Sequence, residues 1–124
     1  MENKIIFLDT SVLIDFYRKQ QKQNSYLFQL TDLYKVFAIS VITEYEILIG
    51  SNNVQDSFWV SFFEKVTILP FTSSVNNEAV KIYRQLKTEN KLIAIPDILI
   101  AATAISNNLA LATLNTKHFK GLKD

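Results

Sequence analysis

Four acidic side chains occur in parts of the sequence that are otherwise apolar. Asp9 follows the run KIIFL, Glu44 and Glu46 lie within VITEYEILIG, and Asp97 is the only charged residue of IPDILIAATAI. Burying unpaired carboxylates costs roughly several kcal/mol each, so a cluster of them requires a compensating cation. Oxygen ligands favour Mg²⁺ or Mn²⁺, and such ions commonly activate water for attack on phosphate esters. The acids therefore predict metal-assisted phosphodiester chemistry, provided that the fold brings them together.

The elements that must position these acids alternate along the chain. Short runs rich in β-formers predict four strands, and segments with helical spacing separate them. This alternation indicates a parallel sheet with helices on both faces. The predicted strands are residues 4–9, 35–40, 66–71 and 109–114, and the predicted helices are residues 12–21, 24–34, 41–50, 57–65, 73–90 and 96–107.

Polar residues follow the predicted strands. Asp9 ends the first strand, Ser40 ends the second and can cap the helix that ends at Gly50, and Thr113 and Asn115 close the last strand. Functional crevices of such sheets lie at the carboxyl ends of the strands, so these groups are expected to gather at one edge. We expect Asp97, at the start of a nearly all-apolar buried helix, to lie at the rim of that crevice. Ala101 and Ala104, on the same face of that helix, leave room for close packing on the sheet.

Each of these residues also has a purely structural interpretation. Asp97 could simply cap its helix, and Asp9 could cap the helix that Thr10 or Ser11 would otherwise begin. Helical spacing does not choose between Glu44 and Glu46, because both flank an apolar stripe. His118 is more typical of a surface residue than of a ligand.

Two helices have predicted apolar stripes. In the helix at residues 41–50 the stripe is Val41, Tyr45, Leu48 and Ile49, and in the helix at residues 73–90 it is Val75, Ala79, Ile82, Tyr83 and Leu86.

Composition limits the classes of protein to which the chain can belong. Its 124 residues suit one domain, and 48% hydrophobic residues can form a core. A net charge of +1 argues against a general polyanion binder. The absence of cysteine and the single histidine exclude thiolate zinc sites and sites that need two histidines.

Two glycines cannot build a phosphate-cradling nucleotide loop. The strand VTILPF ends without the aspartate that a signalling receiver would phosphorylate. No apolar segment predicts a signal peptide or a membrane span, so we expect a soluble, cytoplasmic protein.

Three blocks of the sequence, FLDTSVLIDF, ISVITEYEILIG and IPDILIAATAISNNLALATLNTKHF, resemble the signature blocks of PIN-domain proteins, specifically VapC-type toxins. The blocks stand in the family order, and the resemblance spans essentially the whole chain. It implies an α/β fold with a single PIN domain over residues 1–124. The expected architecture is a PIN-like three-layer sandwich, with a central parallel sheet of four to five strands flanked by helices.

The resemblance also implies a function and assigns roles to residues. VapC-type proteins are Mg²⁺- or Mn²⁺-dependent endoribonucleases that cleave structured RNA, often tRNA or rRNA, and are held inactive by a cognate antitoxin. By motif position, the metal-binding and catalytic acids are Asp9, Glu46 rather than Glu44, and Asp97. The fourth catalytic position falls on Asn115. Water- or phosphate-positioning roles fall on Thr10, Ser11 and Thr113.

The chain departs from the family at that fourth position. Asn115 and His118 stand where many members carry acids, so we expect one firmly held ion between Asp9 and Asp97. This departure leaves an alternative open, in which a degenerate PIN domain only binds RNA or an antitoxin. The aromatic segment SFWVSFF (Phe58, Trp59, Phe62 and Phe63) predicts a homodimer or an antitoxin contact. The candidate RNA-backbone contacts are Arg18, Lys19, Lys117, Lys120 and Lys123.

Overall fold

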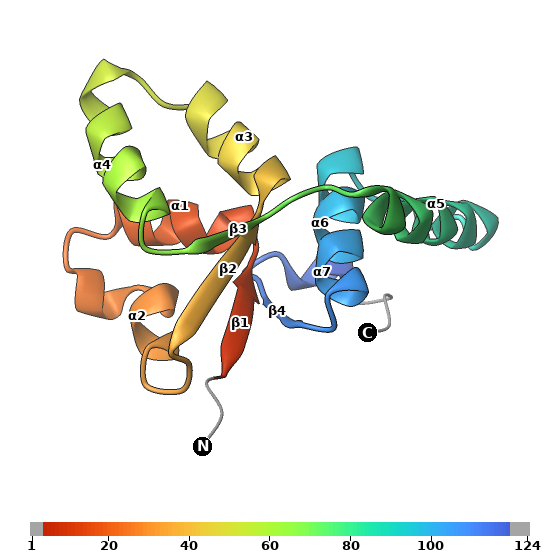
Figure 1. The fold of residues 1–124 in the computed structure, drawn as a ribbon, viewed down its shortest axis with the longest axis horizontal. Helices are drawn as coiled ribbons and strands as arrows, with labels where there is room; N and C mark the ends of the chain where they lie inside the picture. Colours follow the sequence, from red (N-terminus) through yellow and green to blue (C-terminus); the bar gives the residue numbers. More distant parts are fainter. Residues whose placement is uncertain (1–3, 120–124) are drawn as a thin grey trace.

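A four-stranded parallel sheet forms the centre of the protein in the computed structural model, which describes residues 4–119 (Figure 1). Its order is β3-β2-β1-β4, and every neighbouring pair is parallel. The strands are β1 (Ile5–Leu8), β2 (Val36–Ser40), β3 (Thr67–Leu69) and β4 (Ala110–Ala112). All four predicted strands and the parallel arrangement are confirmed, although each observed strand is shorter than its predicted range.

Helices connect the strands as the alternation predicted. The sequence did not predict the short helices η1 and α7, and α2 is shorter than expected. The helices are α1 (Thr10–Arg18), η1 (Lys22–Asn24), α2 (Tyr26–Leu30), α3 (Val41–Ile49), α4 (Asn53–Phe63), α5 (Ser73–Thr88), α6 (Ile95–Ser106) and α7 (Thr116–Phe119). Within residues 4–119, none of them is long and apolar enough to cross a membrane.

The two faces of the sheet bury alternate residues of each strand, as the pleat requires. On one face, Ile6, Leu8 and Ile39 pack with apolar residues of α1, α2, α3 and α4. On the other face, Phe7 and Ala38 pack against α6. This arrangement gives the three layers that the sequence predicted.

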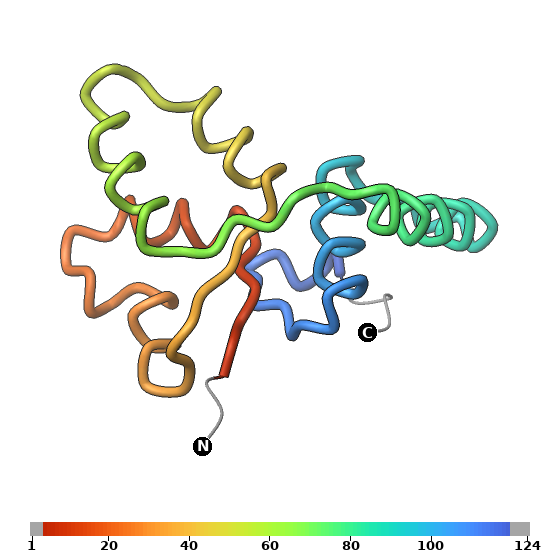
Figure 2. The backbone as a smooth tube through the Cα atoms, in the orientation of Figure 1, coloured from red at the N-terminus to blue at the C-terminus, as the bar shows by residue number. Residues whose placement is uncertain are grey.

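Helix α6 lies between the sheet and α5. Its residue Ala104 packs on the sheet, whereas Ala101 packs in the cluster shared with α5. Figure 2 shows how the backbone reaches this side: the chain runs from α4 through β3 and crosses to α5. The predicted stripe of α5 is buried except for Tyr83, which is 37% exposed. Tyr83 therefore lies at the exposed edge of this stripe.

The aromatic residues of α4 mostly pack within the domain. Trp59 is 3% exposed, and Phe58, Phe62 and Phe63 are partly buried against the same core. Ring contacts link Trp59 to Tyr17, Phe58, Phe62 and Phe63 at centroid distances of 5.0–5.9 Å. Trp59 is therefore a core residue, whereas Phe58, Phe62 and Phe63 stay partly exposed, so their contact with a partner remains a prediction.

Candidate functional site

A cavity of about 710 Å³ opens at the carboxyl ends of the strands, as the fold predicts. It brings together residues from the beginning, middle and end of the chain, including all three acids of the motif. The lining residues are Asp9, Thr10, Ser11, Ile14, Asp15, Arg18, Lys19, Glu46, Asp97, Leu114 and Asn115.

Asp9 lies directly after β1 and is only 1% exposed. Asp9 is the N-cap of α1 and its side chain accepts from Ser11 N, so the capping interpretation of Asp9 is confirmed, and neither Thr10 nor Ser11 is the cap. The carboxylate accepts hydrogen bonds from Ser11 N (3.4 Å), Ser11 Oγ (2.6 Å) and Thr113 Oγ1 (2.8 Å), and all three reach Oδ2. No hydrogen bond from residues 4–119 reaches Oδ1. Oδ1 therefore keeps its capacity to bind a cation.

The loop after β4 is attached to the same carboxylate. Leu114 N donates to Ser11 Oγ at 3.0 Å, and Asn115 N donates to Thr113 Oγ1 at 2.9 Å. Ser11 and Thr113 thus hold Asp9 and place Asn115 at the cavity. Their predicted role in positioning water or phosphate stays a prediction.

Glu46 reaches the cavity from α3, whose cap at Ser40 and end at Gly50 match the prediction. Thr10 Oγ1 donates to Glu46 Oε1 at 2.8 Å and lies 2.9 Å from Thr43 Oγ1. Because Thr10 has one hydroxyl proton and gives it to Glu46, Thr43 is the donor to Thr10. Thr43 is fully buried and is a site residue that the sequence reasoning missed. Thr43 lies four residues before Ile47, and this spacing could have placed both residues on the buried face of the helix.

The predicted apolar stripe of α3 was wrong. Tyr45, Leu48 and Ile49 are 62%, 41% and 66% exposed, whereas Thr43 and Ile47 are buried. Apolar residues occupy most positions of this nine-residue helix, so hydrophobic periodicity could not define its inner face. The buried residues Thr43 and Ile47 mark the inner face of the helix instead.

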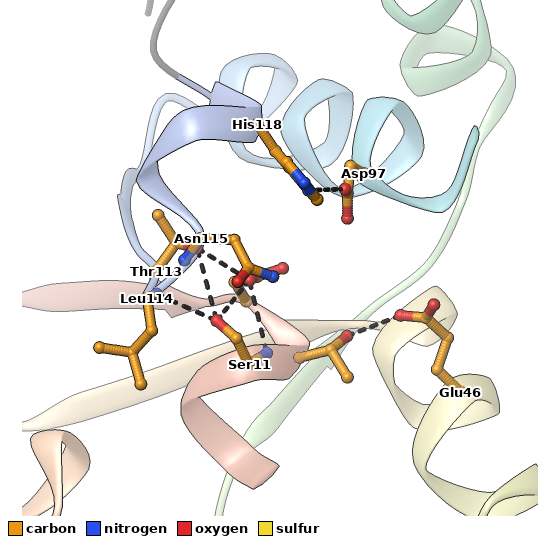
Figure 3. A network of polar contacts seen from close by, with 9 residues as sticks. Ser11, Glu46, Asp97, Thr113, Leu114, Asn115 and His118 are labelled. Carbon is orange, nitrogen blue, oxygen red and sulfur yellow. Dashed lines mark hydrogen bonds and ion pairs between the residues drawn. The ribbon is translucent and has the colours of Figure 1, made fainter. Parts of the chain in front are cut away.

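Asp97 lies in the first turn of α6 but does not cap it. The cap is Ala94, which makes no side-chain hydrogen bond, so the plain capping interpretation of Asp97 is wrong. Its negative charge still complements the helix dipole. Its Oδ2 lies 2.5 Å from Nδ1 of His118, which is on α7 (Figure 3). The prediction that His118 is a surface residue is confirmed, since its side chain is 47% exposed.

The three acids face one cavity, but their side chains do not surround one point. Within residues 4–119, no three His, Cys, Asp or Glu side chains lie close enough together to hold a metal ion. Figure 3 shows Asp97 turned toward His118, and Glu46 bonded to the neighbouring hydroxyl group. Shared coordination of one ion therefore requires rotation of side chains.

The donor set nevertheless fits a hard cation. Among the ion pairs of residues 4–119, none joins a lysine or arginine to Asp9, Glu46 or Asp97. The buried carboxyl group of Asp9 thus has only neutral donors, and the other potential ligands at the cavity are oxygens. This is the environment in which Mg²⁺ or Mn²⁺ stabilises clustered carboxylates.

Basic residues lie at the rim of the cavity. Arg18 and Lys19 line it, and Lys19 pairs with Asp15 at 3.4 Å. Lys117 is exposed on α7. The predicted contacts Lys120 and Lys123 lie outside the described residues.

A second, mainly apolar cavity of about 630 Å³ lies away from the acids, between α1, α2, α4 and β2. Its lining includes Phe28, which is 49% exposed. The lining residues are Phe16, Leu27, Phe28, Thr31, Phe37, Ser57, Phe58, Ser61, Phe62, Lys65 and Val66.

The chain is similar to proteins that are already known. The family model described as PIN domain matches residues 6–123. The chain is 35% identical over 123 residues to Ribonuclease VapC1 of Methanocaldococcus jannaschii, an alignment that covers 99% of this chain and 85% of that protein.

Two solved structures share the fold. One is VapBC2 from Rickettsia felis, solved in complex with a DNA fragment from its promoter. It matches with a TM-score of 0.80 and 26% identity, and the match covers 94% of this chain and 91% of that chain. A toxin–antitoxin complex from Klebsiella pneumoniae matches with a TM-score of 0.78 and 26% identity, covering 94% and 92%.

Proposed function

Because this chain belongs to the PIN domain family, we propose that it is a metal-dependent endoribonuclease, the toxin of a toxin–antitoxin pair. The observation that carries the proposal is the cavity that Asp9, Glu46 and Asp97 all line, with Asp9 buried and no cationic side chain paired to it within residues 4–119. The relative named Ribonuclease VapC1 supports the ribonuclease activity. The substrate that we propose is structured RNA of the tRNA or rRNA class.

Each residue of the cavity has a proposed role in RNA cleavage. Asp9 and Asp97 would hold Mg²⁺ or Mn²⁺, and the chemistry that such an ion would supply there is activation of water and neutralisation of charge on the phosphate. Glu46 is held by Thr10 at Oε1, which leaves Oε2 to orient the attacking water or accept its proton. Asn115 and Arg18, at the cavity, would contact the phosphate backbone. In-line attack by water leaves 5′-phosphate and 3′-hydroxyl ends.

The direct test is cleavage of a structured RNA by the purified protein, with the ends mapped. We expect cleavage in Mg²⁺ or Mn²⁺, no cleavage in EDTA, and 5′-phosphate products. Undiminished cleavage in EDTA, or cyclic phosphate ends, would reject the proposal.

Glu46 and Glu44 offer a matched pair on one helix. Glu46→Gln is expected to slow RNA cleavage about 100-fold, because it removes a proton acceptor from the cavity. Glu44→Gln is expected to leave the rate within about twofold, since Glu44 does not line the cavity. Single-turnover rates at saturating Mg²⁺ measure both, and equal effects of the two variants would contradict the assignment.

A second candidate function is binding without catalysis. The separation of the acidic side chains in this structure favours it, because no three of them lie around one point within residues 4–119. Calorimetry with Mn²⁺ separates the two functions. Absence of binding heat at millimolar Mn²⁺ would support a degenerate domain that binds only RNA or an antitoxin.

The apolar cavity is the proposed docking site of the antitoxin, which we expect to insert an apolar helix there. Phe28→Asp is expected to weaken antitoxin binding about 30-fold or more, because it places a charge in a mainly apolar cavity. RNA cleavage should be unchanged, since Phe28 is remote from the acids. Leu33→Asp is the control, because Leu33 is 63% exposed and outside the cavity. Calorimetry with the product of the adjacent upstream gene measures the change, and equal affinities for the two variants would exclude this cavity.

We also propose a homodimer, with the exposed face of α3 as its contact. Tyr45 and Ile49, 62% and 66% exposed, form an apolar surface there with Leu48. Light scattering at micromolar concentration is expected to give twice the chain mass for the native protein. Tyr45→Glu should yield a folded monomer, whereas a monomeric native protein would contradict the proposal.

A further inference from the structure

The three acids of the cavity share a pattern of hydrogen bonds. In each of them, one carboxylate oxygen accepts hydrogen bonds from residues 4–119 and the other accepts none. The anchored oxygens are Oδ2 of Asp9, Oε1 of Glu46 and Oδ2 of Asp97. A carboxylate fixed at one oxygen presents the other in a defined direction, as a monodentate metal ligand requires.

A fourth acid at the same cavity does not follow the pattern. Asp15 accepts from Tyr26 N at Oδ2 (3.0 Å) and pairs with Lys19 through Oδ1 (3.4 Å). Both of its oxygens are occupied, which marks Asp15 as a structural residue. The pattern therefore separates the functional carboxylates from a neighbouring structural one.

The anchor of Asp97 differs in kind from the other two. Asp9 and Glu46 are anchored by hydroxyl groups of α1 and the loop after β4, whereas Asp97 is anchored by an imidazole. His118 is the only histidine of the chain. An ionised carboxylate can only accept, so Nδ1 of His118 is the donor in this contact.

The position of His118 is fixed from two sides. Leu114, at the start of its loop, bonds to Ser11, and Phe119 packs on the cluster of α5 and α6. His118 N donates to Asn115 O at 3.0 Å, which closes the turn of α7. The imidazole thus lies beside Asp97 on a segment that is held at both ends (Figure 3).

We propose that His118 is a positioning residue for metal binding. By occupying Oδ2, it leaves Oδ1 of Asp97 as the oxygen that can bind the cation. His118 does not itself line the cavity, so it acts through Asp97 rather than as a ligand. This inference rests on the proposed function, because it requires a cation at the cavity.

Mn²⁺ calorimetry at one fixed pH tests the proposal with a pair of variants. His118→Leu removes the donor and is expected to weaken Mn²⁺ binding about 10- to 100-fold. His118→Asn places an amide N–H near the position of Nδ1 and should restore most of the affinity. In the Asp97→Asn background, His118→Leu should have no further effect, because the group that it positions is gone.

The outcomes separate the inference from the proposed function. Equal Mn²⁺ affinity of the native protein and His118→Leu would overturn the inference and leave the metal site intact. Equal weakening by His118→Leu and His118→Asn would also overturn it, in favour of direct ligation by the imidazole. Absence of Mn²⁺ binding by the native protein would overturn the proposed function and the inference together.

A second measurement does not depend on the folding of a His118 variant. Protein labelled with ¹⁵N-histidine gives the signals of one imidazole, because the chain has one histidine. We expect Asp97→Asn to shift the Nδ1 signal without metal, and Mg²⁺ to shift it in the native protein. A signal unchanged by both would overturn the inference.

Discussion

Asp9→Asn is expected to reduce metal-dependent RNA cleavage on the order of 1,000-fold while the protein stays folded. Three donors, from Ser11 and Thr113, reach Oδ2 of Asp9, so the carbonyl oxygen of asparagine must occupy that position. The amide NH₂ group then replaces the open oxygen and presents a donor to the cation. The charge and the ligand are lost together, whereas the helix cap is kept, because asparagine caps helices as well as aspartate.

Cleavage of structured RNA under single-turnover conditions measures this effect, and circular dichroism confirms folding. Asp32→Asn is the matched control, because Asp32 is exposed and lies outside the cavity. It should cleave at the native rate. Full activity of a folded Asp9→Asn variant would remove Asp9 from the mechanism.

Trp59→Ala is expected to lower the free energy of unfolding by about 3–5 kcal/mol. Trp59 is 3% exposed and contacts four aromatic rings, so its removal leaves a cavity that the neighbouring side chains cannot fill. Domains of this size are stable by only about 5–15 kcal/mol, so the loss is a large share of the total.

Urea denaturation followed by circular dichroism measures this loss. The adjacent Val60→Ala serves as the control, because Val60 is 56% exposed, and we expect a change within about 0.5 kcal/mol. Comparable losses for the two variants would mean that Trp59 does not support the core.

The sequence predicted the parallel sheet because β-forming runs and helical segments alternate, and this signal is local. The sequence also located Ser40 and Gly50 at the ends of α3, because the signals that cap a helix are local too. It failed for the face of α3, where Tyr45 and Ile49 are exposed, because an apolar helix has no distinct stripe. It missed α7, which is one turn long and has little periodicity to detect.

The apolar surroundings of Asp9 and Asp97 pointed to them, motif position selected Glu46 over Glu44, and the fold places all three acids at one cavity. Only the tertiary structure determined which oxygen of each carboxylate is held, and by which donor. Thr43 lies 33 residues from Thr10 in the chain, and His118 lies 21 residues from Asp97. Sequence spacing fixes the neighbours of a residue within a turn of helix or along a strand. Contacts over longer separations depend on how the helices pack on the sheet, so the donors that orient the acids became visible only in the folded chain.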